Sequence, residues 1–294
     1  MDKKLNQLVD FFYLNKPYNL VIDKYYLRDL ECMGITINGI NHEKLQSLLN
    51  VAANLQSNYT NDAYRHCIKA DALRIQGYYF ESIEEYLLSI LHEKNNPDAY
   101  KGLGFAYRYV GLIDDAIDAF ETLKKLTPFD KTVYFELANC YFITSNCCLT
   151  IKNLITAIKL DPKYIEAQHK LGLVHENLED YELAIAIYSK IIEQDPTYTD
   201  AYNNLGSLLI KLHRYHQAAK TFKVLLKLTP EQPKAQLGLA VALDKINRHN
   251  ESIKYYRTYL ENKPASANNS HIKKRITALR SGRTGQTRNH LRLV

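Results

Sequence analysis

The sequence predicts an all-α protein built from stacked pairs of antiparallel helices. Five prolines recur at intervals of 34 residues, and each one follows a run with apolar residues at helical spacing. Proline has no backbone N–H and disfavours the α conformation in the residue before it, so each proline ends a helix. A fixed period of this length indicates stacked repeats rather than one globular core. The five are Pro128, Pro162, Pro196, Pro230 and Pro264.

The residue types inside each 34-residue window recur as well. We number each repeat so that its proline falls at position 32, which gives repeats 97–130, 131–164, 165–198, 199–232 and 233–266. Positions 4, 7, 8 and 11 then share one face of a first helix, and positions 20, 24 and 27 share one face of a second. Position 7 is Leu103, Leu137, Leu171, Leu205 or Leu239; position 8 is Gly104, Ala138, Gly172, Gly206 or Ala240; position 20 is Ala116, Thr150, Ala184, Ala218 or Ser252; position 24 is Phe120, Leu154, Tyr188, Phe222 or Tyr256.

Small residues at positions 8 and 20 allow the two helix backbones to approach, while the large residue at position 24 fills the space beside them. Gly111, Glu179, His213 and Asn247 occupy the same place in their repeats and mark the turn between the two helices. Each window is therefore expected to be one helix–turn–helix unit.

This pattern closely resembles the tetratricopeptide repeat. The resemblance implies a right-handed superhelical solenoid of antiparallel helix pairs, in which the first helices line a concave groove. A degenerate repeat is expected at 63–96, where Gly77, Ser82 and Tyr86 fit the pattern but the first helix fits poorly. A degenerate repeat is usual at the end of a stack. The solenoid is expected to span residues 61–264.

The two ends of the chain depart from the pattern. Residues 1–60 carry helical apolar stripes, including one after Asn41, and are expected to form an N-terminal helical cap or a separate partner-binding bundle. Residues 265–280 are expected to form a C-terminal capping helix with Ile272, Ile276 and Leu279 inward. Residues 281–294 read as a basic disordered tail.

The resemblance also implies which side chains face the groove. In the family these are positions 2, 5, 9, 12 and 13, and here they are aromatic and apolar in the earlier repeats and more polar in the later ones. An error of one position in the phase, or an N-terminal segment folded back into the groove, would remove this surface. The predicted partner-binding residues are Lys101, Phe105, Arg108, Tyr109, Phe135, Asn139, Phe142, His169, Leu173, Asn177, Asn203 and Ser207.

The sequence therefore favours a non-enzymatic scaffold or adaptor that binds a peptide segment or partner helix, because exposed apolar side chains commonly mark partner sites. A competing hypothesis makes the repeats a spacer for a basic end that contacts nucleic acid, an anionic membrane or an acidic partner. That end has no Asp or Glu, and subtracting its seven cations from the formal charge of +6 leaves −1 for residues 1–264. The seven cations are Lys273, Lys274, Arg275, Arg280, Arg283, Arg288 and Arg292.

No catalytic, cofactor or metal site is predicted. Cys140, Cys147 and Cys148 lie close in sequence, but zinc sites usually need four ligands at closer pair spacings. His213 and His216 fall at a predicted turn and have no third ligand.

Composition suggests where the chain resides. No run approaches 18 consecutive apolar residues, and the five cysteines lack the spacing of a disulfide framework. A reducing, cytoplasmic setting is expected, with export as an effector without a cleavable signal left open.

Overall fold

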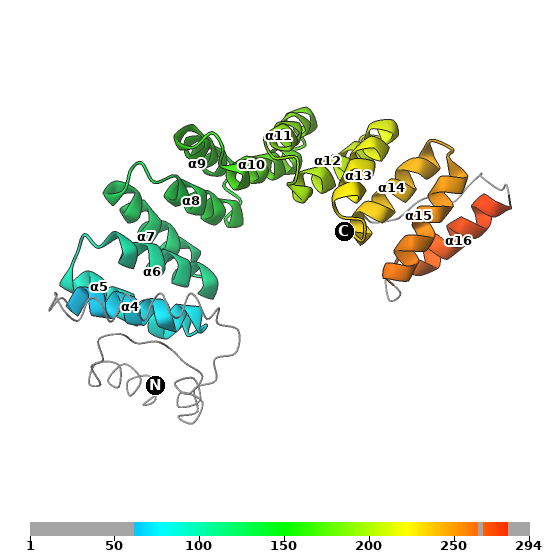
Figure 1. Ribbon diagram of the computed structural model, residues 1–294. Helices are drawn as coiled ribbons and strands as arrows, with labels where there is room; N and C mark the ends of the chain where they lie inside the picture. Colours follow the sequence, from blue (N-terminus) through cyan, green and yellow to red (C-terminus); the bar gives the residue numbers. More distant parts are fainter. Residues whose placement is uncertain (1–61, 264–266, 282–294) are drawn as a thin grey trace, which may run out of the picture. The chain divides into compact units, whose positions relative to one another are not determined.

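The computed structural model of the protein describes residues 62–263 and 267–281. Every regular element in these two ranges is a helix, which confirms the predicted all-α fold. Figure 1 shows consecutive helices paired antiparallel along the chain. The predicted N-terminal cap and nearly all of the predicted tail lie outside the described residues.

First and second helices alternate along the repeats. The first helices are α4 (Asp62–Ile75), α6 (Pro97–Val110), α8 (Lys131–Ile143), α10 (Ile165–Asn177), α12 (Thr199–Lys211) and α14 (Pro233–Lys245). The second helices are α5 (Tyr79–His92), α7 (Ile113–Leu126), α9 (Cys147–Leu160), α11 (Tyr181–Gln194), α13 (Tyr215–Leu228) and α15 (His249–Asn262), and α16 (Asn269–Arg280) follows them.

The helix boundaries follow from local chemistry. The prolines at position 32 follow the ends of second helices, as in α7, which ends at Leu126 before Pro128. Asn96 and Asp130 cap α6 and α8, because their side-chain oxygens accept backbone N–H groups of the first turn. Pro97 starts α6, where its missing N–H costs no hydrogen bond.

The turn inside each repeat places position 15 in the left-handed region. Its φ is 85° at Gly111, 63° at Glu179, 60° at His213 and 62° at Asn247, so the predicted turn residues are confirmed. Ser145, with a φ of 59°, holds the same place in its repeat and was not predicted. Outside glycine this conformation is sterically costly.

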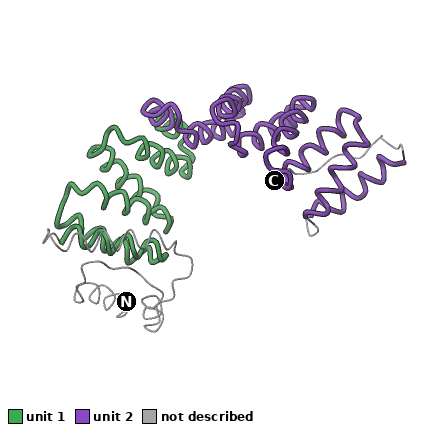
Figure 2. The backbone as a smooth tube through the Cα atoms, viewed as in Figure 1, with its two compact units in different colours: residues 1–153 green, residues 154–294 purple. Residues whose placement is uncertain are grey.

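The chain divides into two compact units, residues 1–153 and residues 154–294, which Figure 2 colours separately. We call them unit 1 and unit 2, and the boundary falls inside α9. Each unit is described by itself below.

The buried interior of unit 1 contains two apolar clusters. One lies around Tyr86 and Leu103, between α4, α5 and α6. The other lies around Phe120 and Leu137, between α7 and α8. The side chains of Tyr86, Phe120 and Leu137 are fully buried. Burial on this scale stabilises each repeat by about 1.5–3 kcal/mol per large side chain.

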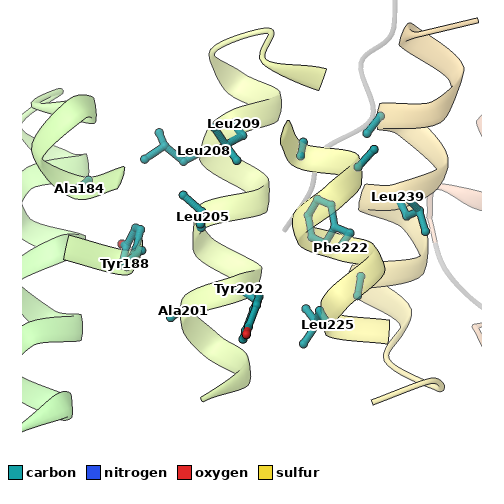
Figure 3. Close-up of a cluster of buried hydrophobic side chains, with 14 of the residues drawn as sticks. Ala184, Tyr188, Ala201, Tyr202, Leu205, Leu208, Leu209, Phe222, Leu225 and Leu239 are labelled. Atoms are coloured by element: carbon teal, nitrogen blue, oxygen red, sulfur yellow. The ribbon is translucent and has the colours of Figure 1, made fainter. Parts of the chain in front are cut away.

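The core of unit 2 is a longer continuous cluster. Figure 3 shows Tyr188, Leu205, Phe222 and Leu239 pointing between neighbouring helices, and all four belong to the same buried cluster. Positions 3 and 10 are also buried in the first helices α6, α8, α10, α12 and α14, although the sequence analysis did not select them. These residues are Ala99, Ala106, Val133, Cys140, Ala167, Val174, Ala201, Leu208, Ala235 and Ala242.

The predicted contact between positions 8 and 24 is present in both units. A Cβ atom added at Gly104 would lie 2.7 Å from the ring of Phe120, and one added at Gly206 would lie 2.6 Å from the ring of Phe222. The small residue at position 8 therefore makes room for the aromatic ring in its own repeat.

Helix α16 packs on the last repeat of unit 2. Ile272, Ile276 and Leu279 are buried in one cluster with Leu237 and Tyr256. The fourth inward residue of α16 is Arg275, whose guanidinium donates two hydrogen bonds of 2.7 Å to the carboxylate of the buried Asp244 in α14. This helix therefore covers an end of the repeat stack that would otherwise expose apolar side chains.

Candidate functional site

The first helices of unit 1 share one continuous face, which we call the unit 1 face. It consists of positions 9, 12 and 13 of α4 and positions 5, 9, 12 and 13 of α6 and α8, together with Glu136. Arg108 of α6 and Glu136 of α8 form an ion pair of 3.0 Å across this face. Asn139 donates a second hydrogen bond of 3.3 Å to the same carboxylate. The structure thus brings together Arg108 and Asn139, which the sequence analysis assigned to one surface.

Phe105 lies at the centre of the unit 1 face. Its ring lies within cation–π distance of two guanidinium groups, those of Arg74 at 5.8 Å and Arg108 at 5.5 Å. An edge of the ring also meets the buried ring of Phe120 at 5.6 Å between centroids. Phe105 is therefore half-buried: one side supports the core and the other contributes to the face.

A polar network fixes Arg74 at the edge of the unit 1 face. Arg74 bonds Asp71 at 2.9 Å and the hydroxyl of Tyr86 at 3.0 Å. The Tyr86 hydroxyl in turn donates to Asp71 at 2.6 Å. Burial, followed by the nearby Asp71 carboxylate, raises the pKa of Tyr86, so its hydroxyl stays protonated and serves as the donor. These bonds hold the guanidinium beside Phe105.

Two apolar side chains of the unit 1 face are strongly exposed. Tyr109 is 61% exposed and Ile143 is 55% exposed, and both occupy position 13. The Tyr109 ring stacks on Tyr79 with 4.8 Å between centroids, which limits its motion. Three other predicted residues on this face are half-buried, namely Lys101, Phe135 and Phe142.

The first helices of unit 2 present a different chemistry. His169 of α10 meets Asn204 of α12 with 2.7 Å between Nε2 and Nδ2, and the amide donates to a neutral ring. Its imidazole also packs against the rings of Tyr188 and Tyr198, at 5.9 and 5.4 Å. Burial lowers the pKa of His169, which favours this neutral form. Leu173 is half-buried and Asn177 is exposed.

Asn203 departs from the expected groove position. Its side chain is 95% buried, being only 5% exposed, and Oδ1 has no hydrogen-bond partner among the described residues. The hydroxyl of Ser207, one turn later, also lacks a partner there. Helix α14 packs beside α12. The burial of Asn203 removes it from the accessible face.

The sequence analysis did not select several polar residues of these helices, although the sequence contains a pattern that identifies some of them. In three repeats position 24 is tyrosine, and its hydroxyl donates to an acid on the paired first helix. Tyr188 reaches Glu176 at 3.2 Å and Tyr256 reaches Asp244 at 3.4 Å, as Tyr86 reaches Asp71. Glu176 and Asp244 both occupy position 12, where the repeats with phenylalanine at position 24 have Arg108 or Ile210, so these two pairings were visible in the sequence. Asp71 lies at position 9 of its repeat and does not follow this rule.

Other candidate residues are buried or contact neighbouring side chains. Burial raises the pKa of the Cys140 thiol to about 11, which keeps it protonated. His213 bonds the hydroxyl of Tyr215 at 2.6 Å on an exposed turn. Of the seven cations predicted for the basic end, Arg275 faces inward on Asp244 and is not available to an outside partner. Within the described ranges, no helix is long and apolar enough to cross a membrane.

Comparison with known proteins agrees with the resemblance to the tetratricopeptide repeat. Models described as "Tetratricopeptide repeat" match residues 165–198 and 203–267. The chain resembles a crystal structure of MamA with 28% identity and a TM-score of 0.51, over 54% of this chain and 93% of that one. A comparison with curated protein sequences finds no match.

Two further solved structures show the fold alone, because their sequence identity is low. YrrB, described as "a TPR protein with an unusual peptide-binding site", is 17% identical with a TM-score of 0.54, over 64% of this chain and 97% of that one. The Cut9–Hcn1 hetero-tetramer structure is 18% identical with a TM-score of 0.58, over 93% of this chain and 53% of that one.

Proposed function

Because the chain belongs to the tetratricopeptide repeat family, we propose that it is a scaffold or adaptor that binds a segment of another protein. The proposed site is the unit 1 face, and the partner is an extended or helical segment with apolar side chains. The proposal assigns no catalytic step to the chain. The similar YrrB structure is described as having a peptide-binding site, which makes the same kind of ligand reasonable here.

The observation that carries the proposal is the exposure of Tyr109 and Ile143 on the face that also contains Phe105. Tyr109 and Ile143 repeat position 13 on adjacent first helices, and each exposes more than half of its side-chain surface. Aromatic side chains are enriched among binding hot spots. Burying three apolar anchors at about 1.5–3 kcal/mol each would support micromolar affinity after the cost of association.

The ion pair between Arg108 and Glu136 would orient a partner on this surface. Both groups are partly accessible, with side-chain exposures of 24% and 15%, and the guanidinium of Arg108 lies 5.5 Å from the centre of the Phe105 ring. A partner with a carboxylate or a backbone carbonyl near its apolar anchor would find a donor already in place. Such preorganised donors contribute more to specificity than to raw affinity.

Affinity capture from the lysate of the source cell tests the proposal. The intact chain is compared with a variant carrying Tyr109→Ser and Ile143→Ser, which changes exposed side chains and leaves the core intact. A control variant carries Phe129→Ser and Leu183→Ser, which are 85% and 53% exposed but lie outside the first helices. Partners lost with the first variant and retained with the control support binding at the unit 1 face.

The competing role of the basic end is tested in the same experiment. A chain ending at Ser281 removes Arg283, Arg288 and Arg292 and keeps all of α16. Partners that disappear with this truncation, after nuclease treatment or with moderate added salt would indicate charge-driven binding through the tail. That result would reject the unit 1 face as the principal site.

A further inference from the structure

Helix α5 has an apolar outer surface that the described residues leave exposed. We call it the outer stripe of α5, and its four side chains are 39–73% exposed. They are Phe80, Leu87, Leu88 and Leu91. Phe80, Leu87 and Leu91 recur at spacings of seven and four, so they lie along one side of the helix.

The other repeats show that this stripe is exceptional. Phe80, Leu87, Leu88 and Leu91 occupy repeat positions 18, 25, 26 and 29. At these positions the second helices of the other repeats carry mainly charged or polar residues. They are Asp114, Glu121, Thr122 and Lys125 in α7; Cys148, Ile155, Thr156 and Lys159 in α9; Glu182, Ser189, Lys190 and Glu193 in α11; His216, Lys223, Val224 and Lys227 in α13; Asn250, Arg257, Thr258 and Glu261 in α15. The repeat architecture itself therefore does not require an apolar surface here, and contiguous exposed apolar patches mark interaction sites.

We propose that the outer stripe of α5 is the docking surface for residues 42–55 of the same chain. That segment carries apolar residues at helical spacing, at Leu45, Leu48, Leu49, Ala52 and Leu55. Its length as a helix, about 20 Å, matches the span of about 16 Å from Phe80 to Leu91. Both surfaces would then be buried without a second molecule.

The point where the N-terminal segment joins the repeats supports this occupant. The end of α5 lies beside the start of α4, because the hydroxyl of Ser89 donates to the carbonyl of Ala63 at 2.6 Å. The rings of His66 and His92 also stack there, with 5.5 Å between centroids. Residues 56–61 can span up to about 20 Å, which is enough to carry the chain from Leu55 past Leu91 to α4.

Connectivity favours an occupant from the same chain over a separate one. A segment tethered by a few residues has an effective concentration in the millimolar range, so even weak contacts keep it docked. Four apolar side chains contribute about 1.5 kcal/mol or more each when buried. A second copy or a foreign helix must overcome the additional cost of association.

Hydrogen exchange of the full-length chain, read by mass spectrometry, tests the inference. In the variant carrying Leu87→Asp and Leu91→Asp, amides of residues 42–55 should exchange at least about tenfold faster than in the unchanged chain. The matched control carries Lys223→Asp and Lys227→Asp at the same two repeat positions of α13. In that control the exchange of residues 42–55 should not change.

Other results would overturn the inference. Unchanged exchange of residues 42–55 in the Leu87→Asp and Leu91→Asp variant would show that the segment does not dock on α5. If the variant also converts a dimer into a monomer by light scattering, the occupant is a second copy of the chain. The exchange of the α5 amides in the same experiment shows whether the helix stays folded in the double variant. If α5 unfolds, the single change Leu91→Gln, at the most exposed position of the stripe, is used in place of the double variant.

Discussion

The repeats at the two ends of the described chain each pair the tyrosine at position 24 with a carboxylate of the first helix, at position 9 in one and position 12 in the other, and they neutralise it differently. In unit 1, Tyr86 donates to Asp71, and the compensating cation Arg74 comes from the same helix. In unit 2, Tyr256 donates to Asp244, and the compensating cation Arg275 comes from the additional helix α16. The acid of unit 1 is thus satisfied within its repeat, whereas the acid of unit 2 requires a further element.

A second difference lies in the interiors of these two repeats. Position 7 is Lys69 in the first repeat, where the five repeats that follow have leucine. Its amine meets the buried Glu85 at 2.7 Å, and His66 meets the same carboxylate at 2.7 Å. The poor sequence match of the first repeat therefore has a physical basis: an ion cluster replaces an apolar contact. The comparison indicates that one repeat geometry accommodates two kinds of interior when each charge is paired.

Among the changes that test this comparison, removing Glu85 should reduce stability the most. Glu85→Ala removes the buried carboxylate that Lys69 and His66 share and should destabilise unit 1 by about 3 kcal/mol, measured by denaturant unfolding. The double change Lys69→Leu with Glu85→Leu restores an apolar interior and should recover most of that loss. Equal losses in the single and double variants would show that the ion cluster has no such role.

Removing Arg275 should have the next largest effect, confined to the end of unit 2. Among the described residues, Arg275→Ala leaves the carboxylate of Asp244 with the longer contacts to Tyr256 and His249, at 3.4 and 3.7 Å. We expect a loss of about 2–3 kcal/mol and rapid amide exchange throughout α16. Slow exchange of α16 in this variant would mean that Ile272, Ile276 and Leu279 dock the helix without the ion pair.

Glycines at position 6 provide a matched pair between the units. A Cβ atom at Gly102 would overlap the ring of Tyr86, and one at Gly238 would overlap the ring of Phe222. Tyr86 is held by Asp71 and Arg74, so its ring cannot shift without losing hydrogen bonds. Gly102→Ala should therefore destabilise by about 2–3 kcal/mol and Gly238→Ala by about 1–2 kcal/mol, as read by thermal unfolding. The reverse order would contradict the anchoring argument.

Acidification should affect the two units at different pH values. Burial lowers the pKa of His169, so the stability of its neutral contact with Asn204 is complete above the unfolded value of about 6.5 and is lost as pH falls below it. Burial acts to raise the pKa of Glu85, but hydrogen bonds from His66 and Lys69 outweigh it and lower this pKa. The stability from Glu85 therefore persists until pH falls below about 4.3.

Amide exchange measured as a function of pH separates these two transitions. Helices α10 and α12 should loosen first on acidification, and α4 and α5 should follow at lower pH. His169→Gln is the control, because it should remove the first transition while leaving the second. Simultaneous loosening of both regions would contradict the assignment.

The smallest effect is expected at the turns. In unit 1, the left-handed turn residue is glycine in the first two repeats, at Gly77 and Gly111, and serine in the third, at Ser145. In unit 2, the described turns use Glu179, His213 and Asn247. Glu179→Gly should stabilise unit 2 by about 0.5–1 kcal/mol, because relief of strain exceeds the added entropy of the unfolded chain. Gly111→Ala should destabilise unit 1 by a similar amount, and a change of opposite sign in either variant would contradict the turn assignment.

The periodic parts of the fold were predictable because they depend on local sequence. The prolines and the residues at positions 8, 15 and 24 determine helix ends, turns and close packing from within one repeat. Contacts between repeats were less accessible to prediction. Asn203 was expected on an open face but is buried, and Glu136 gained its role only through Arg108 of the preceding repeat. Such contacts depend on how neighbouring first helices align, which no single repeat encodes.

Site-specific photo-cross-linking tests the proposed protein-binding role most directly. A photoreactive phenylalanine analogue replaces Tyr109 on the unit 1 face or, in the comparison protein, the exposed Asp118 on the outer side of α7. Both proteins are irradiated in lysate of the source cell and their adducts are identified by mass spectrometry. The account predicts a defined protein adduct at position 109 that position 118 does not form. Adducts at position 118 alone, or none at position 109, would contradict it.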